Sequence, residues 1–367
     1  MTAAALPGPD PAFWTGRRVF VTGHTGFKGG WLCAWLGHLG ADVYGYALAP
    51  PTTPSFFAVV GVERIVRGST LADIRDYDRV RAALQQARPE VVFHLAAQPL
   101  VRYSYQHPID TFAVNVMGVA NLLDAVRATG GVRAVVNVTS DKCYEDRGHA
   151  AGYREEDPMG GHDPYSSSKG CAELITAAYR RSYLQAAGVG VATARAGNVI
   201  GGGDWAADRL IPDLFRAVES GTPLLVRSPD AVRPWQHVLE PVRGYLMLAE
   251  RLHADGQAWA GAWNFGPAEA DDRSVRWIIE RLTSSLPGLS WSCDLQAHPH
   301  EAACLRLDSG KARQNLTWAP RWPLDTALAQ TVEWYSAWRR GQDMHRTSLV
   351  QIDAYAAGHT VENGVSL

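Results

Sequence analysis

The chain has 367 residues, of which 35 are Lys or Arg and 37 are Asp or Glu, so its formal net charge is −2. Hydrophobic residues make up 46% and charged residues 20%, which is typical of a folded globular protein and excludes a disordered chain. The balanced charge, without basic runs, argues against nucleic acid and anionic membranes as partners. The length suits one large domain or two lobes.

The first residues, up to Phe13, lack the basic start and apolar core of a secretory signal, so we expect a cytoplasmic protein with a flexible end over residues 1–13. The longest uncharged stretch covers residues 43–62, but Pro50, Pro51 and Pro54 would break a membrane-spanning helix, and a loop is predicted there. The cysteines form no CxxC pair, which predicts neither a metal site nor disulfides. We expect buried reduced thiols at Cys33, Cys143, Cys171, Cys293 and Cys304.

Short β-branched runs alternate with segments of helical spacing from residue 17 onward. The predicted strands cover residues 17–23, 41–48, 89–97, 133–140 and 188–197, and the main predicted helices cover residues 27–40, 110–130 and 168–188. This alternation predicts an α/β fold with a doubly wound parallel sheet of the Rossmann type.

After about residue 200 the pattern changes to Gly-, Pro- and Trp-punctuated segments with amphipathic helices over residues 210–221 and 324–338. We expect a dinucleotide-binding domain over residues 14–200, with returning segments at about 235–265. A smaller mixed α/β lobe that binds the substrate is expected over about 201–340. The tail, residues 341–367, is expected to be flexible.

A glycine-rich turn follows the first predicted strand. Gly23, Gly26 and Gly29 form a GxxGxxG pattern, in which glycines allow a tight turn and the amides of a helix N-terminus face a pyrophosphate. A glycine turn without a ligand is the competing interpretation. The other candidate cofactor contacts of this turn are Thr25, Phe27 and Lys28.

The choice between NAD and NADP stays open on local chemistry. The second predicted strand ends without the acidic residue that usually binds the ribose 2′-hydroxyl, and Lys28 is compatible with a 2′-phosphate or with a solvated helix start. Asp73 and Ile74, after the third strand position, suit an adenine amino group, although an exposed loop acid explains Asp73 equally well.

Three residues form a candidate catalytic set. Tyr165 and Lys169 are four residues apart on a predicted helix, so they share a face, and Ser140 ends the preceding strand. An ammonium beside the phenol is expected to lower the tyrosine pKa and make it a proton acceptor. Together with the glycine turn, this set favours a catalytic site.

With these motifs the chain resembles the extended short-chain dehydrogenase/reductase family, over residues 17–338. The resemblance implies action on nucleotide-activated sugars, and it implies catalytic roles for Ser140, Tyr165 and Lys169. It also assigns the pyrophosphate to the three glycines and the adenine to Asp73 and Ile74. The remaining residues assigned to the cofactor are Leu95, Ala96, Ala97 and Asn115.

Longer strings resemble the branch of this family that dehydrates CDP-glucose. They are VTGHTGFKGGWL, HLAAQPLVRYSY, VTSDKCYE, DPMGGHDPYSSSKG, RAGNVIGGGDWA with DRLIPD, and RPWQHVLEP. This resemblance implies CDP-glucose or another sugar nucleotide as substrate and a retained NAD, with NADP not excluded.

The segment Ser140-Asp141-Lys142 favours a 4,6-dehydratase over a 4-epimerase, because only a dehydratase needs an acid for the departing 6-hydroxyl. The resemblance implies that Asp141 is this acid, and Lys142 occupies the place of the base in related enzymes. A surface Asp-Lys pair is the competing interpretation. A dehydratase or epimerase for another nucleotide, and a non-catalytic dinucleotide sensor, remain alternatives.

Fixed cations are needed for the substrate diphosphate, and Arg209 and Arg233 are the best candidates. Trp235 and His237 are candidates for the nucleotide, although a core Trp and a structural His are the competing interpretations. The other candidate substrate contacts are Gln98, Tyr103, Asn198, Leu210 and Ile211. The resemblance implies a homodimer, or a dimer of dimers, formed by helices within residues 110–129 and 166–187.

Overall fold

The computed structural model describes residues 6–148, 152–294, 296 and 306–359. Seven parallel strands form one sheet in the order β11-β6-β5-β4-β1-β2-β3, which confirms the predicted doubly wound topology. In that order the strands are β11 (Gly261–Asn264), β6 (Gly190–Arg195), β5 (Ala134–Val138), β4 (Val91–His94), β1 (Arg18–Thr22), β2 (Asp42–Ala47) and β3 (Gly68–Leu71).

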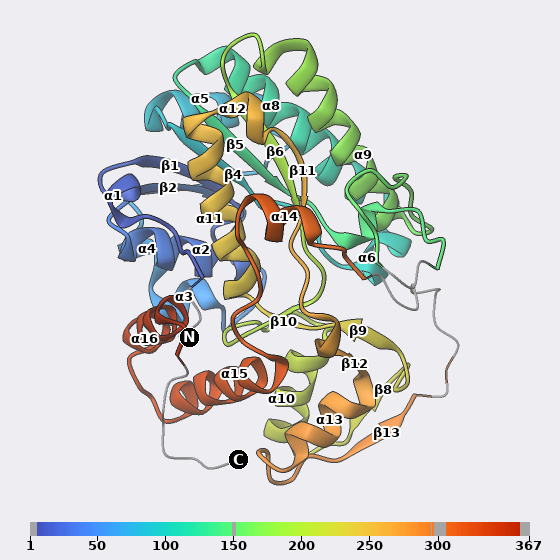
Figure 1. The fold of residues 1–367 in the computed structure, drawn as a ribbon. Helices are drawn as coiled ribbons and strands as arrows, with labels where there is room; N and C mark the ends of the chain where they lie inside the picture. The colour runs from blue at the N-terminus through green and yellow to red at the C-terminus, as the bar shows by residue number, and fades with distance from the viewer. Residues whose placement is uncertain (1–5, 149–151, 295, 297–305, 360–367) are drawn as a thin grey trace.

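The central strands are buried on both faces, as expected when helices cover a parallel sheet. Successive side chains point to opposite faces: Val19 and Val21 of β1 join one hydrophobic cluster, and Phe20 joins the other. The first cluster includes α2 (Phe27–His38) and α11 (Leu239–Ala254). The second cluster includes α5 (Tyr77–Ala87), α8 (Gly118–Thr129) and α9 (Pro164–Tyr179), and Figure 1 shows these layers.

The helix that begins at Pro108 runs without a break through a π-helical turn to Thr129. Its parts are α7 (Pro108–Phe112), η1 (Ala113–Met117) and α8. Among the described residues it is the one helix long and apolar enough to cross a membrane, by length and composition only. Its buried residues, Leu122 and Val126 among them, pack in the second hydrophobic cluster, which accounts for part of the apolar composition.

A second lobe lies beyond the carboxyl edge of the sheet, in the lower part of Figure 1. The lobe and its connections contain β7 (Val199–Ile200), α10 (Leu210–Ser220), β8 (Leu224–Val226), β9 (Val232–Pro234), β10 (Gln236–His237), η4 (Glu269–Asp271), β12 (Asp272–Ser274), α13 (Val275–Thr283), β13 (Trp291–Cys293) and α15 (Leu324–Arg339). Between these segments the chain returns to the sheet through α11 and β11, so both lobes contribute to the edge where ligands of open sheets bind.

Among the described residues, the segments near both chain ends pack against the rest of the fold. At the N-terminal end, Asp10 caps α1 (Pro11–Trp14), and its backbone N–H donates to Glu250 at 2.8 Å. Near the other end, α16 (Met344–Ala357) buries Ile352 and Tyr355 fully, so the expectation of a flexible tail is wrong for this helix. The apolar spacing on α16 was overlooked, and burial of that face anchors the helix.

The remaining elements are α3 (Phe56–Val60), α4 (Val62–Ile65), α6 (Val101–Gln106), η2 (Asp141–Cys143), η3 (Arg180–Leu184), α12 (Gly256–Trp259) and α14 (Gly310–Asn315). The three prolines of residues 43–62 lie in the segment between β2 and α3. Cys33 and Cys143 are buried free thiols, Cys171 is half-buried, and Cys293 is exposed, so burial was wrongly expected for the last. Cys304 lies outside the described residues.

Candidate active site

The glycine turn lies between β1 and α2, where the topology of the sheet places a dinucleotide pyrophosphate. Gly23 has a φ of +78°, and a Cβ there would lie 2.8 Å from the backbone of Ala96. A Cβ on Gly29 would lie 2.1 Å from the carbonyl oxygen of Gly23, so only glycine fits either position. Gly26 begins α2 without a side-chain cap, which leaves amides of the first turn for an anion.

The other residues of the turn have separate positions. The Thr25 hydroxyl donates to the Leu48 carbonyl oxygen at 2.9 Å and so ties the turn to the end of β2. Phe27 opens α2, with its ring beside Gly201 of the second lobe. These contacts hold the turn between the two lobes.

Lys28 points toward Tyr245 of α11 and lies near the catalytic residues. Its Nζ lies 3.4 Å from the Tyr245 hydroxyl, and burial together with the charges of Arg209 and Lys169 lowers its pKa to about 7. The charge of Asp141 acts in the opposite direction. Lys28 therefore belongs to the catalytic side of the site, and the suggestion that it favours NADP is not supported by its position.

Asp73 follows β3, but its carboxylate is already engaged by Arg75. The Arg75 Nε lies 3.0 Å from each carboxylate oxygen, and these hydrogen bonds are the largest cause of the lowered pKa of Asp73. Ile74 is buried against Gly118 of α8. An adenine amino group would therefore meet a carboxylate that an arginine partly neutralises.

The segment after β4 is fixed by hydrogen bonds to Thr22, the last residue of β1. The Thr22 hydroxyl accepts from the backbone N–H groups of Leu95 and Ala96, both at 3.1 Å, and Ala97 is half-buried beside them. Thr22 also contacts Nδ1 of His94 at 2.7 Å. Burial lowers the His94 pKa to about 3, so this imidazole is neutral at pH 7.

Asn115 and Gln98 brace the same loop. The Asn115 side chain bonds the backbone N–H and carbonyl of Gln98 at 2.8 and 3.0 Å, and its Nδ2 donates to Ser168 of α9 at 2.9 Å. The Gln98 side chain in turn bonds Leu100 and Thr111. Both side chains use their polar atoms within the protein, which favours a supporting role over the direct ligand contacts predicted from sequence.

Ser140, Asp141 and Lys142 lie together where β5 leads into η2. The Ser140 hydroxyl donates to Asp141 Oδ1 at 2.8 Å, and the Lys142 backbone N–H donates to the Ser140 hydroxyl oxygen at 3.2 Å. Asp141 is only 5% exposed, and burial raises the pKa of its carboxyl group despite the opposing charges of Lys142 and Arg233. A carboxyl group in such surroundings suits a general acid.

Tyr165 and Lys169 lie one turn apart on α9, and Lys169 Nζ is 5.9 Å from the centre of the Tyr165 ring. Burial raises the Tyr165 pKa to about 12, while its hydrogen bond with Ser140 and the charge of Arg209 lower it. Burial therefore outweighs these two effects, and the Tyr165 pKa is raised where the sequence analysis expected Lys169 to lower it. Burial also lowers the Lys169 pKa, to about 8.

The two candidate cations for the substrate diphosphate approach the acid-base set from the second lobe. Arg209 NH1 lies 2.8 Å from the buried carboxylate of Asp204, and its charge acts on Tyr165. Arg233 lies on β9, and its charge acts on Asp141. The structure thus brings both arginines to the catalytic residues.

The remaining predicted substrate contacts differ in accessibility. Tyr103, on α6, is 37% exposed and donates to Asp110 at 3.2 Å. Trp235 is buried and donates to the Arg273 carbonyl oxygen. The fully buried His237 packs against the rings of Trp31 and Trp322, which favours the core role.

Three further predicted residues come from the loop and helix of the second lobe. Asn198 is half-buried just before β7, Leu210 is half-buried at the start of α10, and Ile211 is buried beside it. The side chain of Ile211 belongs to the main hydrophobic cluster, so only its backbone is positioned to contact a ligand.

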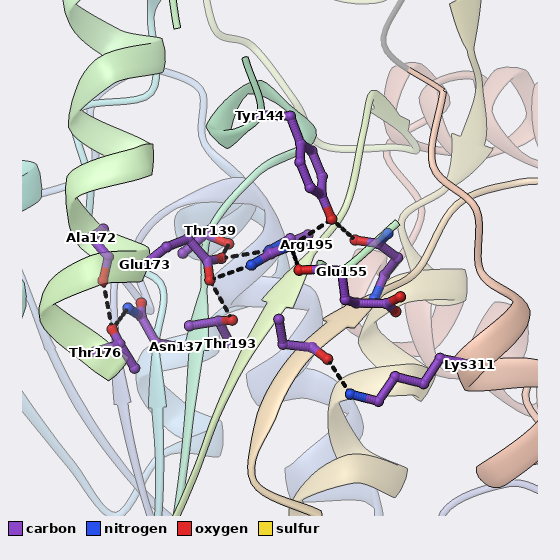
Figure 2. A network of polar contacts seen from close by, with 12 residues as sticks. Asn137, Thr139, Tyr144, Glu155, Ala172, Glu173, Thr176, Thr193, Arg195 and Lys311 are labelled. Atoms are coloured by element: carbon purple, nitrogen blue, oxygen red, sulfur yellow. Dashed lines mark hydrogen bonds and ion pairs between the residues drawn. The ribbon is translucent and has the colours of Figure 1, made fainter. Parts of the chain in front are cut away.

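The sequence analysis missed a buried polar network beneath the catalytic residues. Glu173, one turn after Lys169 on α9, binds Arg195 of β6, and Arg195 NH1 lies 2.5 Å from the Tyr144 hydroxyl oxygen (Figure 2). The four-residue spacing from Lys169 was a usable signal. Pairing with Arg195, which comes from a distant strand, had no local signature.

A glycine turn on an uncapped helix, a buried acid and a Tyr-Lys pair at one sheet edge are features of a dinucleotide-dependent enzyme of the Tyr-x-x-x-Lys type. The profile of the NAD-dependent epimerase/dehydratase family matches residues 19–266. The chain belongs to this family.

Similarity to individual proteins extends over nearly the whole chain. The CDP-glucose 4,6-dehydratase of Salmonella typhimurium is 50% identical over 96% of this chain and 99% of its own. The structure of MoeE5 in complex with UDP-glucuronic acid and NAD is 27% identical, with a TM-score of 0.73, over 88% of this chain and 99% of that chain. The dTDP-glucose 4,6-dehydratase of Streptomyces venezuelae, with NAD bound, shares the fold at 24% identity and a TM-score of 0.73, over 89% and 99% of the two chains.

Proposed function

We propose that this protein catalyses the 4,6-dehydration of CDP-glucose to CDP-4-keto-6-deoxyglucose and water, using NAD. The observation that carries the proposal is Asp141, a buried carboxyl group with a raised pKa that bonds Ser140 and neighbours Lys142. The 50% identity to a CDP-glucose 4,6-dehydratase supports the choice of reaction and of nucleotide.

The residues present fit a dinucleotide. The uncapped start of α2 offers amides to a pyrophosphate, and the tight surroundings of Gly23 and Gly29 let the backbone approach a ligand closely. NAD, when bound, accepts a hydride from carbon 4 of the sugar and returns it to carbon 6. Leu95, Ala96 and Ala97 would line the ribose side of this site.

In the first step Tyr165 takes the proton of the 4-hydroxyl as carbon 4 is oxidised to a ketone. Tyr165 needs its tyrosinate form for this step: burial opposes that form, and the charge of Arg209 favours it. The ammonium of Lys169, one helical turn away, adds a further positive charge to the same region.

The ketone makes the hydrogen on carbon 5 acidic, and Lys142 is the proposed base for it. Lys142 needs its neutral amine for this step. Asp141 donates its proton to the 6-hydroxyl, which departs as water and leaves a double bond between carbons 5 and 6. Carbon 6 then regains the hydride taken from carbon 4, and the proton held by Lys142 returns to carbon 5. The sum is the loss of one water.

Exposed apolar side chains support a homodimer as the working form. Ile109 of α7 is 83% exposed, Met117 of η1 is 55% exposed, and Leu174 of α9 is 61% exposed. Large apolar residues on adjacent helices are typical of an interface between subunits. The free buried thiols Cys33 and Cys143 fit a reducing, cytoplasmic location.

A panel of nucleotide sugars tests the function. Purified protein is incubated with CDP-, dTDP-, UDP- or GDP-glucose, with and without added NAD or NADP, and mass spectrometry follows loss of one water. We expect loss with CDP-glucose and NAD. Loss from another nucleotide sugar alone would contradict the substrate, and no loss from any of the four would contradict the dehydratase.

A further inference from the structure

Glu173 is a buried carboxylate that the proposed reaction does not use. Its side chain is 6% exposed and accepts two hydrogen bonds from hydroxyl groups, from Thr139 at 2.5 Å and from Thr193 at 2.7 Å. It also accepts from Arg195 Nε at 2.9 Å and from Arg195 NH2 at 2.8 Å. Thr193 and Arg195 lie on β6, and Thr139 directly follows β5 (Figure 2).

The carboxylate lies on the catalytic face of α9. Glu173 follows Lys169 by four residues, so the two side chains share one face of the helix. Burial lowers the Lys169 pKa to about 8, and the charges of Cys143 and Glu173 raise it. Burial holds the pKa of the Cys143 thiol well above its usual range, so that thiol is neutral at pH 8. The ion pair of Glu173 with Arg195 makes Glu173 the group of the two that bears on Lys169.

The same carboxylate joins the elements that carry the other catalytic groups. Thr139 directly precedes Ser140 and Asp141 at the end of β5, while Arg195 ends β6 two residues before Gly197. A Cβ on Gly197 would lie 3.0 Å from Asp141 Oδ2, so the exit of β6 touches the proposed acid. Helix α9 and both strand ends therefore meet at Glu173.

Arg195 also makes hydrogen bonds to residues other than Glu173. Its NH1 lies 2.5 Å from the Tyr144 hydroxyl oxygen and 3.1 Å from the Glu155 carbonyl oxygen. The Tyr144 hydroxyl donates to Asn264 Oδ1 at 2.8 Å. A guanidinium bonded on two sides holds the carboxylate of Glu173 in one orientation.

We infer that Glu173 is a positioning residue, which keeps Lys169 in its ammonium form and fixes α9 against the strand ends that carry Ser140 and Asp141. This inference rests on the proposed function only for its kinetic consequences. The effect on the proton of Lys169 does not depend on the reaction and is measurable without turnover.

The chain has only four lysines, Lys28, Lys142, Lys169 and Lys311, so NMR of protein labelled at the lysine ε-carbon gives four assignable titrations. In Glu173→Gln we expect the midpoint of Lys169 to fall by about one pH unit or more, since an opposite charge is lost and Arg195 is left uncompensated. In Thr139→Val, the matched control, the carboxylate remains and the midpoint should stay near that of the natural protein. An unmoved Lys169 in Glu173→Gln, or an equal shift in both variants, would overturn the inference.

Turnover adds a second readout. The alkaline limb of kcat against pH should move to lower pH in Glu173→Gln, whereas in Thr139→Val kcat should fall at every pH with the limb in place. In Glu173→Asp, which restores the charge, the limb should return toward its natural position. A uniform loss of kcat in Glu173→Gln, with an unmoved limb, would mean a structural role only and would contradict the inference.

Leaving Arg195 buried without its partner is strongly destabilising and can prevent folding of the single variant. The double variant Glu173→Met, Arg195→Met removes both charges, and the Lys169 midpoint should again lie below that of the natural protein because, of the two charges, that of Glu173 acts on Lys169. An unchanged midpoint in this folded double variant would overturn the inference. If no sugar nucleotide is turned over, the proposed function fails while the titrations still decide the role of Glu173.

Discussion

Gly197 and Asp141 are in contact across the site: a Cβ built on Gly197 would lie 3.0 Å from Oδ2 of the carboxyl group. The same Cβ would lie 3.3 Å from the ring of Pro234, so the new methyl group has little room to move aside. Ser140 holds the other carboxyl oxygen at 2.8 Å. The position of Asp141, the proposed acid, therefore depends on a glycine in the segment that follows β6.

Replacement of Gly197 with Ala should displace the carboxyl group of Asp141 by a few tenths of an ångström and lower kcat about tenfold or more, because proton transfer is sensitive to such shifts. Binding of NAD should be unchanged, since the glycine turn lies elsewhere. Steady-state kinetics and calorimetry measure the two effects. In the Asp141→Asn background, Gly197→Ala should lower kcat much less. An equal loss of kcat in both backgrounds would show that displacement of the Asp141 carboxyl group is not the cause.

Asp141→Asn should lower kcat by about 10² to 10⁴, because the amide cannot supply the proton for the 6-hydroxyl. The cofactor site should remain intact, as a titration with NAD would show. Unchanged turnover would exclude Asp141 as the acid.

The same substitution should stabilise the fold at pH 7. Burial raises the Asp141 pKa in the folded state, so the ionised carboxylate destabilises the fold above that pKa, and the neutral amide removes this cost. The gain in Tm should shrink as the pH falls toward about 3.9, the ordinary value for aspartate. If the Tm of Asp141→Asn at pH 7 were lower than that of the natural protein, the ionised carboxylate of Asp141 would not destabilise the fold.

The titration midpoint of Lys28 should depend on the charge of Lys169, whereas that of Lys169 should depend little on Lys28. Lys28, with a pKa of about 7, titrates while Lys169, with a pKa of about 8, is still charged. Lys169→Met should therefore raise the Lys28 midpoint, while Lys28→Met should leave that of Lys169 nearly unchanged. NMR of the labelled lysines measures both midpoints. A Lys28 midpoint of about 10.4 would show a solvated ammonium instead.

Leu174→Arg should convert the proposed homodimer to monomers, because it places a charge in the apolar face formed with Ile109 and Met117. Leu225→Arg is the matched control, since Leu225 is similarly exposed, at 65%, but lies on β8 of the second lobe. Sedimentation velocity separates the two states. Equal masses for both variants and the natural protein would place the interface elsewhere.

The periodicity of the sequence was sufficient for five of the seven strands of the sheet, because each of these carries its own apolar pattern. The two edge strands, β3 and β11, were not among the predicted strands, and the residues of β3 are mostly exposed. Tyr165, Lys169 and Ser140 were identifiable for the same reason: their spacing is local and their strand and helix are adjacent. The engagement of Asp73 by Arg75 and the inward direction of Lys28 depend on side-chain packing that no local pattern encodes. The pairing of Glu173 with Arg195 depends on β6, which the chain reaches 22 residues later.

The central claim is an internal hydride transfer, and CDP-glucose carrying deuterium at carbon 4 tests it most directly. The account predicts that the product has lost one water and carries the deuterium at carbon 6, as NMR of the isolated product would show. Deuterium that remains at carbon 4, or is lost to solvent, would contradict the account.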